Sequence, residues 1–153
     1  MKKSEELLKL AEANNIEIID IFVDDEKLEG LYADNTVLIN TIVKENKYNE
    51  VLGHELGHHF TLEGNNLLKK QGNDLQEFCA DAWSYKNIIP LKKLIEYKLW
   101  DYEEWEILES ENITHEFLSN VFLYYKDKYG YEDVKVDGYV VNFYPEFTVK
   151  VIY

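Results

Sequence analysis

Three of the four histidines of this chain fall within residues 53–60, which read Gly-His-Glu-Leu-Gly-His-His-Phe. The pattern His54-Glu55-x-x-His58 lies in a predicted helix, so its two imidazoles stand at positions i and i+4, about 40° apart around the helix axis. Both imidazoles can bind one metal ion from the same face. Glu55 projects about 100° from His54 and can reach a water molecule beside the ion without binding the ion. The segment therefore predicts a zinc site with His54 and His58 as ligands and Glu55 as the catalytic base.

A surface helix with stray histidines is the alternative interpretation of this segment. A chance match is expected in roughly one of a hundred sequences of this composition. The alternative also leaves Gly53 and Gly57 unexplained, since each glycine costs about 1 kcal/mol relative to alanine inside a helix. Two glycines at i and i+4 predict the close approach of another backbone, as a metal site between packed elements requires. We therefore favour the metal site.

A catalytic zinc site needs a third protein ligand and one open position for water. Glu77 and Asp81 stand at i and i+4 in the next predicted helix and share one face. Cys79 lies about 200° from Glu77 around the axis and cannot join that face. The spacing selects Glu77 as the oxygen ligand and Asp81 as the carboxylate that accepts an N–H from a ligating histidine. In a chain with 30 acidic residues a solvated helix face is the alternative, and Cys79 remains a minor candidate ligand.

The hydrophobic pattern predicts an α+β fold in a single domain, residues 1–153. Residues 1–43 form an N-terminal helix and strands, residues 44–93 the metal-binding helices, and residues 94–153 acidic helices and a terminal hairpin. The small N-terminal sheet or hairpin is expected to pack on the helix that carries His54-Glu55-x-x-His58. The expected elements, in order, are a helix capped by Ser4 and ending near Asn14, a strand over 16–23, a hairpin over 31–40 with its turn at Asp34-Asn35, helices over about 49–63, 75–88, 91–99, 101–109 and 114–129, and a hairpin within 134–153 turning at Asp137-Gly138 or Pro145-Glu146.

The composition excludes some classes of function. The formal net charge of the 153 residues is -14, and all 16 basic residues are lysine. A protein that binds duplex DNA needs a basic patch and usually uses arginine for its base contacts, so no direct nucleic-acid binding is expected. The single cysteine cannot form an internal disulfide, and no run approaches the length of a membrane span. We expect a cytoplasmic protein without a membrane partner.

The metal-site residues also resemble a known family. The likeness to the ImmA/IrrE metallopeptidases, which are zincins of the gluzincin type, covers about residues 30–93. It rests on His54-Glu55-Leu56-Gly57-His58-His59, Glu77-x-x-Ala80-Asp81-x-Trp83 and Ile88-Ile89-Pro90. Trp83 stands where the family usually has phenylalanine, and Cys79 where a second acidic residue is frequent. Family members are typically zinc proteins of bacteria, mobile elements and phages that cleave a repressor, often one encoded beside them.

The resemblance and the motif together predict a zinc metallo-endopeptidase that uses Zn²⁺ as its cofactor and cleaves a specific protein, such as a phage or mobile-element repressor. Glu55 is expected to take a proton from a zinc-activated water and pass it to the leaving amine. A second oxyanion donor would normally help, and His115 and the twelve tyrosines are candidates. One alternative is a zinc-binding anti-repressor that acts by stoichiometric binding without proteolysis. A broad digestive peptidase fits an unsignalled cytoplasmic chain poorly.

The uneven charge suggests what kind of partner the chain binds. Residues 1–43 carry a net charge of -6, residues 44–93 carry zero, and residues 94–153 carry -8. Solubility alone is one explanation. The other is that the acidic flanks attract a basic protein, such as a basic helix-turn-helix repressor.

Overall fold

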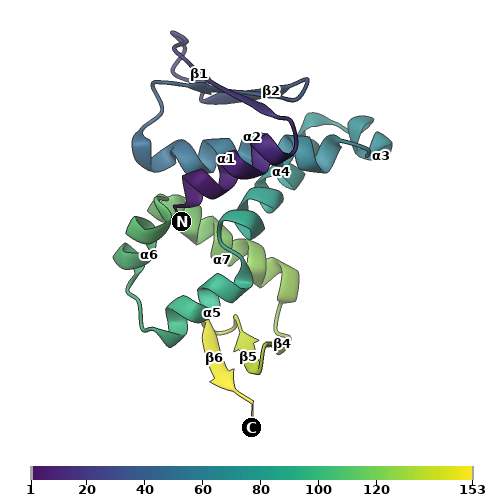
Figure 1. Ribbon diagram of the computed structural model, residues 1–153. Helices are drawn as coiled ribbons and strands as arrows, with labels where there is room; N and C mark the ends of the chain where they lie inside the picture. Colours follow the sequence, from purple (N-terminus) through teal and green to yellow (C-terminus); the bar gives the residue numbers. More distant parts are fainter. Residues whose placement is uncertain (1, 153) are drawn as a thin grey trace.

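Figure 1 shows a computed structural model that describes residues 2–152. The chain begins with helix α1 (Lys3–Ala13), followed by strands β1 (Glu17–Ile21), β2 (Gly30–Ala33) and β3 (Thr36–Asn40). β2 and β3 form the expected hairpin, and both residues of its Asp34-Asn35 turn have positive φ. β1 pairs with β3 in parallel, which gives the sheet order β1-β3-β2.

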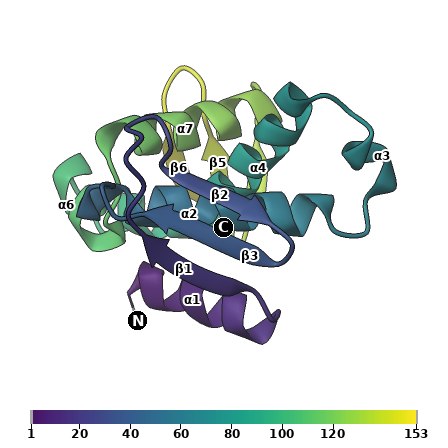
Figure 2. The ribbon, with the colours of Figure 1, turned by 90° about the horizontal axis from the view of Figure 1, so that it is seen from above.

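This sheet covers helix α2 (Tyr48–Leu62), which a short 3-10 turn (Glu45–Lys47) precedes. Figure 2 shows the sheet lying across α2 with α1 beside β1. Val37 and Ile39 alternate along β3 and are fully buried, as are Leu52 and Leu56 on α2. The apolar face of β3 and the apolar arc of α2 therefore form the upper core, and the predicted packing of a small sheet on the motif helix is confirmed.

Helix α4 (Asn73–Ile88) runs against α2, and the short helix α3 (Asn66–Lys69) links the two. A Cβ added at Gly57 would lie 2.5 Å from the carbonyl oxygen of Ala80, so the two backbones touch there, as the glycine pair predicted. At Gly53 the nearest atom to an added Cβ is Cδ1 of Ile88, at 2.6 Å. The second glycine therefore makes room for a side chain instead of a backbone.

Helices α5 (Leu91–Leu99), α6 (Glu104–Glu111) and α7 (His115–Tyr129) complete the lower half of Figure 1. Leu94, Leu118 and Val121 are buried among them. Hydrogen bonds tie this half to the metal-site helices. Among them, the Tyr125 hydroxyl donates to the carbonyl of Ile89, at 2.8 Å, and the Asn49 side-chain amide donates to the carbonyl of Glu111, at 2.9 Å.

The chain ends in a second sheet, of strands β4 (Val134–Val136), β5 (Tyr139–Asn142) and β6 (Thr148–Val151), all antiparallel in the order β4-β5-β6. The expected terminal hairpin is thus a three-stranded meander, because the turn at Asp137-Gly138 and the connection through Pro145 are both used. Phe143 in that connection is fully buried, which anchors the sheet to α7 through the stacked ring of Tyr125.

Two predicted boundaries were wrong. Ser4 does not cap α1, because Lys2 holds the extended cap position and its carbonyl already accepts from the amide of Glu6. The helix expected from residue 101 begins at Glu104 instead. Asp101 has a φ of 55°, outside the range of a right-handed helix, and the amide of Glu103 donates to the carboxylate of Glu106 at the new start.

None of the helices in residues 2–152 combines the length and the apolar character needed to cross a bilayer.

Candidate metal centre and active-site cleft

Three side chains from two helices converge where α2 faces α4. Nε2 of His54 lies 2.7 Å from Oε2 of Glu77, and Nε2 of His58 lies 3.1 Å from Oε1 of the same carboxylate. The two Nε2 atoms are 3.2 Å apart. The structure thus brings together the three residues that the sequence proposed as ligands.

The spacing of these atoms fits a small metal ion. In a tetrahedral zinc site with bonds of about 2.0–2.1 Å, neighbouring ligand atoms stand about 3.3 Å apart. The three ligand atoms of His54, His58 and Glu77 all lie within 4.8 Å of one another. Two imidazole lone pairs and a carboxylate pointing at one another repel unless a cation or a proton lies between them. The donor set of two nitrogens and one oxygen, on one side only, suits zinc with an open position.

Asp81 holds one of the ligands in place. Its Oδ1 lies 2.8 Å from Nδ1 of His54, so Nδ1–H can donate to the carboxylate and leave the Nε2 lone pair free for a metal. Burial lowers the pKa of His54, but the hydrogen bond and charge of Asp81, with the charges of Glu55 and Glu77, outweigh it and raise the pKa to about 9. Burial and the neighbouring His54 lower the pKa of His58. The pKa values of the two imidazoles are therefore shifted in opposite directions.

Glu55 is buried beside the metal centre, with 8 % of its surface exposed. Burial raises its pKa to about 7, with His54 opposing the shift and Glu77 adding to it. A carboxyl group with a pKa near neutrality can both take and return a proton, as a general base must. No side chain within hydrogen-bonding distance satisfies it among the described residues, so its carboxylate is free to act on a substrate or a water.

Gly30 sets how closely the sheet approaches Glu55. A Cβ at Gly30, the first residue of β2, would lie 2.7 Å from Cγ1 of Val51 and 3.0 Å from Cγ of Glu55. The edge strand can therefore lie directly against the base only because this residue has no side chain. Sequence reasoning missed this role, although a glycine at the start of a strand is a known sign of close backbone approach.

The metal centre opens into a cleft of about 510 Å³. Its lining includes six acidic side chains, against which stand only two lysines, Lys27 and Lys47. Lys47 is already paired with Glu29, at 3.1 Å. The segment of residues 44–93 is neutral in sequence, but folding brings four of its acids and only one of its seven lysines to the cleft. Residues 1–43 add one acid and one lysine, and residues 94–153 add one acid, so the cleft is acidic. The acidic residues are Glu29, Glu50, Glu55, Glu77, Asp81 and Glu116.

Tyr85 also lines this cleft, one helical turn beyond Asp81 on α4. Burial raises its pKa to about 12, with further contributions from Asp81, Glu116 and Glu50, so its hydroxyl keeps its proton at neutral pH. Its ring is held by Phe117, at a centroid distance of 5.3 Å. The sequence left twelve tyrosines as possible donors, and only the packing of α4 against α7 singles out this one.

The remaining sequence candidates lie elsewhere. His115 is exposed and pairs with Glu104, with Nδ1 2.7 Å from Oε1, and it does not line the cleft. The structure therefore does not bring His115 to the metal centre, because at the start of α7 it faces α6. His59 hydrogen-bonds the hydroxyl of Tyr32, at 2.7 Å. Cys79 is half-buried on α4 and outside the ligand group.

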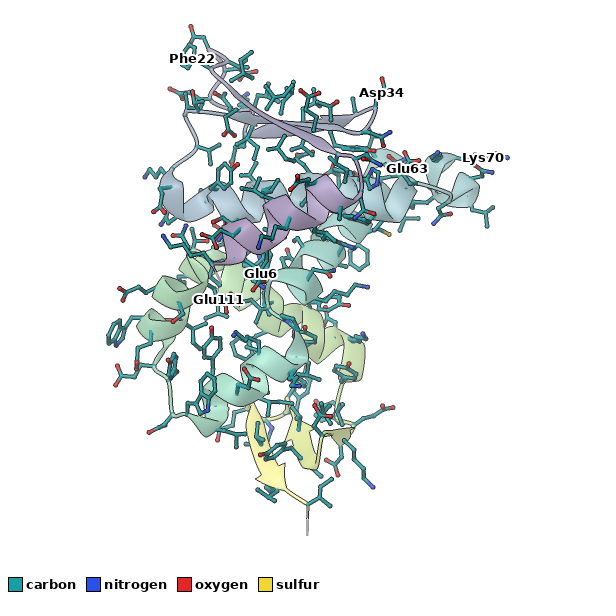
Figure 3. The ribbon with its side chains drawn as sticks, viewed as in Figure 1. Glu6, Phe22, Asp34, Glu63, Lys70 and Glu111 are labelled. Carbon is teal, nitrogen blue, oxygen red and sulfur yellow. The ribbon has the colours of Figure 1, made fainter. Side chains whose placement is uncertain are left out.

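The far end of α2 is fastened to the sheet. In Figure 3, Asp34 marks the hairpin turn and Glu63 marks the end of α2 beneath it. Tyr32 connects the two, since its hydroxyl lies 3.5 Å from Oε1 of Glu63 as well as contacting His59. The ligand-bearing helix is thus fixed at its C-terminal end by the same sheet that covers Glu55.

Comparison with protein families identifies the domain that carries the metal centre. The Peptidase M78 family model, described as an IrrE N-terminal-like domain, matches residues 11–120. The chain belongs to this family. The matched region contains α2, α4 and the start of α7, and with them every residue of the metal centre, so the resemblance seen in the sequence is confirmed and the chain contains a metallopeptidase-like domain. Comparisons with curated proteins and with solved structures gave no significant match.

Proposed function

We propose that this protein is a zinc-dependent endopeptidase that cleaves a peptide bond in another protein. The observation that carries the proposal is the convergence of His54, His58 and Glu77 beside a buried, unpaired Glu55, in a chain of a peptidase family. Zinc is proposed because two imidazoles and one carboxylate with an open side are a common donor set of catalytic zinc sites. When bound there, the ion supplies a Lewis acid for both the attacking water and the scissile carbonyl.

The chain's own residues supply the proton transfer and the positioning. Glu55 takes a proton from the attacking water and later delivers it to the leaving amine, for which a pKa of about 7 is suitable. Asp81 keeps His54 in the tautomer that presents Nε2. The protonated hydroxyl of Tyr85, which lines the cleft, is the donor that we propose for the negative charge that develops on the carbonyl oxygen.

A stoichiometric anti-repressor that uses the metal only for structure is the competing function. Structural zinc sites usually close with four protein ligands, whereas this centre brings together three. A purely structural site also has no use for a buried carboxylate whose ionisation is opposed by its surroundings. These two observations favour catalysis.

The acidic cleft supports a basic protein as the substrate, and a helix-turn-helix repressor in the cytoplasm remains our proposed partner. A polypeptide with lysines and arginines near the bond to be cleaved would complement the six acids of the cleft. Complex formation with such a repressor should weaken steeply as salt is added. An affinity that did not change with salt would count against a basic partner.

The decisive experiment compares zinc content and cleavage in the wild type and in four variants. His54→Ala, His58→Ala and Glu77→Ala should lose zinc, measured by elemental analysis after dialysis. Glu55→Gln should keep zinc and lose about 10²–10⁴-fold in the rate of peptide cleavage. New termini in reduced casein and in a random peptide library, read by mass spectrometry, report cleavage. Retained cleavage by Glu55→Gln would refute the mechanism, and zinc binding with no new termini in any substrate would favour the anti-repressor.

A further inference from the structure

A second groove of about 510 Å³ lies beside the metal cleft, between α4 and α7. Two other helices, α5 and α6, separate its two walls in the sequence, so no local sequence pattern reveals the groove. The residues that form it are Phe78, Asp81, Ala82 and Tyr85 from α4, and Asn120, Leu123, Tyr124, Asp127 and Lys128 from α7.

Each wall is one continuous helix face. The α4 residues stand at i, i+3, i+4 and i+7, and four of the α7 residues, from Asn120 to Asp127, repeat the same spacing. On α4 the small side chain of Ala82 comes between the large rings of Phe78 and Tyr85. Because the alanine side chain is much smaller than the two rings, an apolar hollow stays open between them.

The walls expose large hydrophobic groups to solvent. Phe78 is 65 % exposed and Leu123 is 55 % exposed. Contiguous apolar surface of this kind on a folded protein is a common mark of a binding site. The charged side chains Asp127 and Lys128 stand beside it, and the Lys128 ammonium lies over the ring of Tyr129, at 5.3 Å.

The groove is continuous with the metal cleft, because Asp81, Tyr85 and Asn120 line both. Asp81 also holds His54, so the groove begins one side chain away from a metal ligand. A polypeptide whose scissile bond lies at the metal centre therefore places a neighbouring side chain over the groove.

Much of the α7 wall lies outside the region that the family model matches. The family match ends at residue 120, whereas Leu123, Tyr124 and Asp127 follow it. The metal centre thus lies inside the matched region, whereas the groove beside it is built partly from residues that follow that region.

We propose that the groove is a specificity subsite that binds one large hydrophobic side chain of the substrate, aromatic or branched aliphatic, next to the bond to be cleaved. The inference rests on the proposed peptidase function. A volume of about 510 Å³ lies in the range of small-molecule pockets and is sufficient for one large side chain. Continuity with the cleft selects the substrate as the occupant over a second copy of the chain.

The test uses four zinc-binding amino-acid hydroxamates that differ only in their side chain: benzyl, isobutyl, methyl and carboxyethyl. Their affinity for the zinc-loaded protein is measured by calorimetry. The benzyl and isobutyl compounds should bind at least about tenfold more tightly than the methyl compound, and the carboxyethyl compound should gain nothing. Ala82→Leu fills the hollow and should reduce the preference to within about twofold, as should Leu123→Ser. Leu99→Ser, an exposed leucine of α5 outside the groove, is the matched control and should keep the preference.

Other outcomes contradict specific parts of the proposal. Equal binding of all four hydroxamates would overturn the subsite and leave the metal centre standing. If no hydroxamate bound, that result would count against the metal centre. The groove would then be tested separately, by adding N-acetyl-leucine amide to the metal-free protein and measuring the nuclear magnetic resonance shifts of Phe78 and Leu123. Absence of those shifts would overturn the subsite as well. A concentration-dependent dimer that Ala82→Leu abolishes, seen by analytical ultracentrifugation, would replace the substrate with a second copy.

Discussion

Helices α2 and α4 face each other across the candidate metal centre, but they differ in how deeply they are buried. On α2, the side chains of His54 and His58 are 24 % and 13 % exposed, and Glu55 is buried beneath the sheet. On α4, the side chains of Glu77 and Asp81 are about half exposed, at 53 % and 47 %. Packing therefore fixes the groups on α2, whereas the α4 carboxylates are held by their bonds to the histidines.

Because of this difference in burial, the two helices have different roles in the site. The buried helix sets the geometry and shifts the pKa values, since desolvation acts most strongly there. The exposed helix supplies the anionic charge that a cation needs and also borders the open clefts. If the division is correct, changes on α2 should affect stability most, and changes on α4 should mainly affect metal affinity.

The largest expected effect is that of Gly57→Ala on folding. Its Cβ would lie 2.5 Å from the Ala80 carbonyl oxygen. A backbone atom cannot move aside as the end of a side chain can, so α2 and α4 would have to separate. We expect a loss of about 3 kcal/mol in the free energy of unfolding, measured by urea denaturation. Gly53→Ala is the matched control, because there the new methyl meets the end of the Ile88 side chain, and the change should stay within about 1 kcal/mol of wild type. Equal effects of the two variants would contradict the backbone contact.

The second prediction concerns the buried base. The pKa of Glu55 is raised from 4.5 to about 7 in the folded protein, so the folded state favours the neutral carboxyl group. The free energy of unfolding is therefore undiminished by this group below pH 4.5, and it falls as the pH rises from 4.5 to about 7. In metal-free protein, Glu55→Gln should therefore become more stabilising between pH 5 and pH 8, by about 2 kcal/mol. Urea unfolding at both pH values measures it. Glu12→Gln, an exposed glutamate on α1, should show no such change, and a pH-independent effect of Glu55→Gln would mean that the base is not desolvated.

The smallest of the three effects is expected on α4. Asp81→Ala removes the partner of His54 Nδ1 and should weaken zinc binding about tenfold, at the lower end for such partners because the carboxylate is half exposed. The pKa of His54 should fall from about 9 in the same variant, which histidine titration by nuclear magnetic resonance can follow. Asp74→Ala removes the same charge from the exposed first turn of α4 and should change neither quantity.

Much of the metal centre was predictable from sequence because its parts are local. Two ligands and the base lie within one helical turn, and Glu77 and Asp81 lie within another, so helical geometry alone orders each pair. The elements of residues 31–62 and 73–99 were also predicted closely, since the Asp34-Asn35 turn, Gly64 and Pro90 mark their boundaries. The parallel pairing of β1 with β3 was not predicted, because it joins β1 to the second strand of the hairpin, with β2 between them in the sequence.

The parts that sequence could not supply depend on contacts between distant segments. Gly30 and Tyr85 enter the site only because β2 lies over Glu55 and α7 packs on α4. His115 was an equally reasonable donor by residue type, but α6 places Glu104 beside it.

By itself, then, the sequence determined which helix turns carry the metal ligands, since residue spacing along a helix fixes which side chains share a face. Only the tertiary structure decided how deeply each ligand is buried, which tyrosine faces the cleft, and that a neutral segment turns its acids toward the cleft and most of its lysines elsewhere. Burial, pKa and local charge all depend on which distant elements pack together, and a linear spacing contains no record of that.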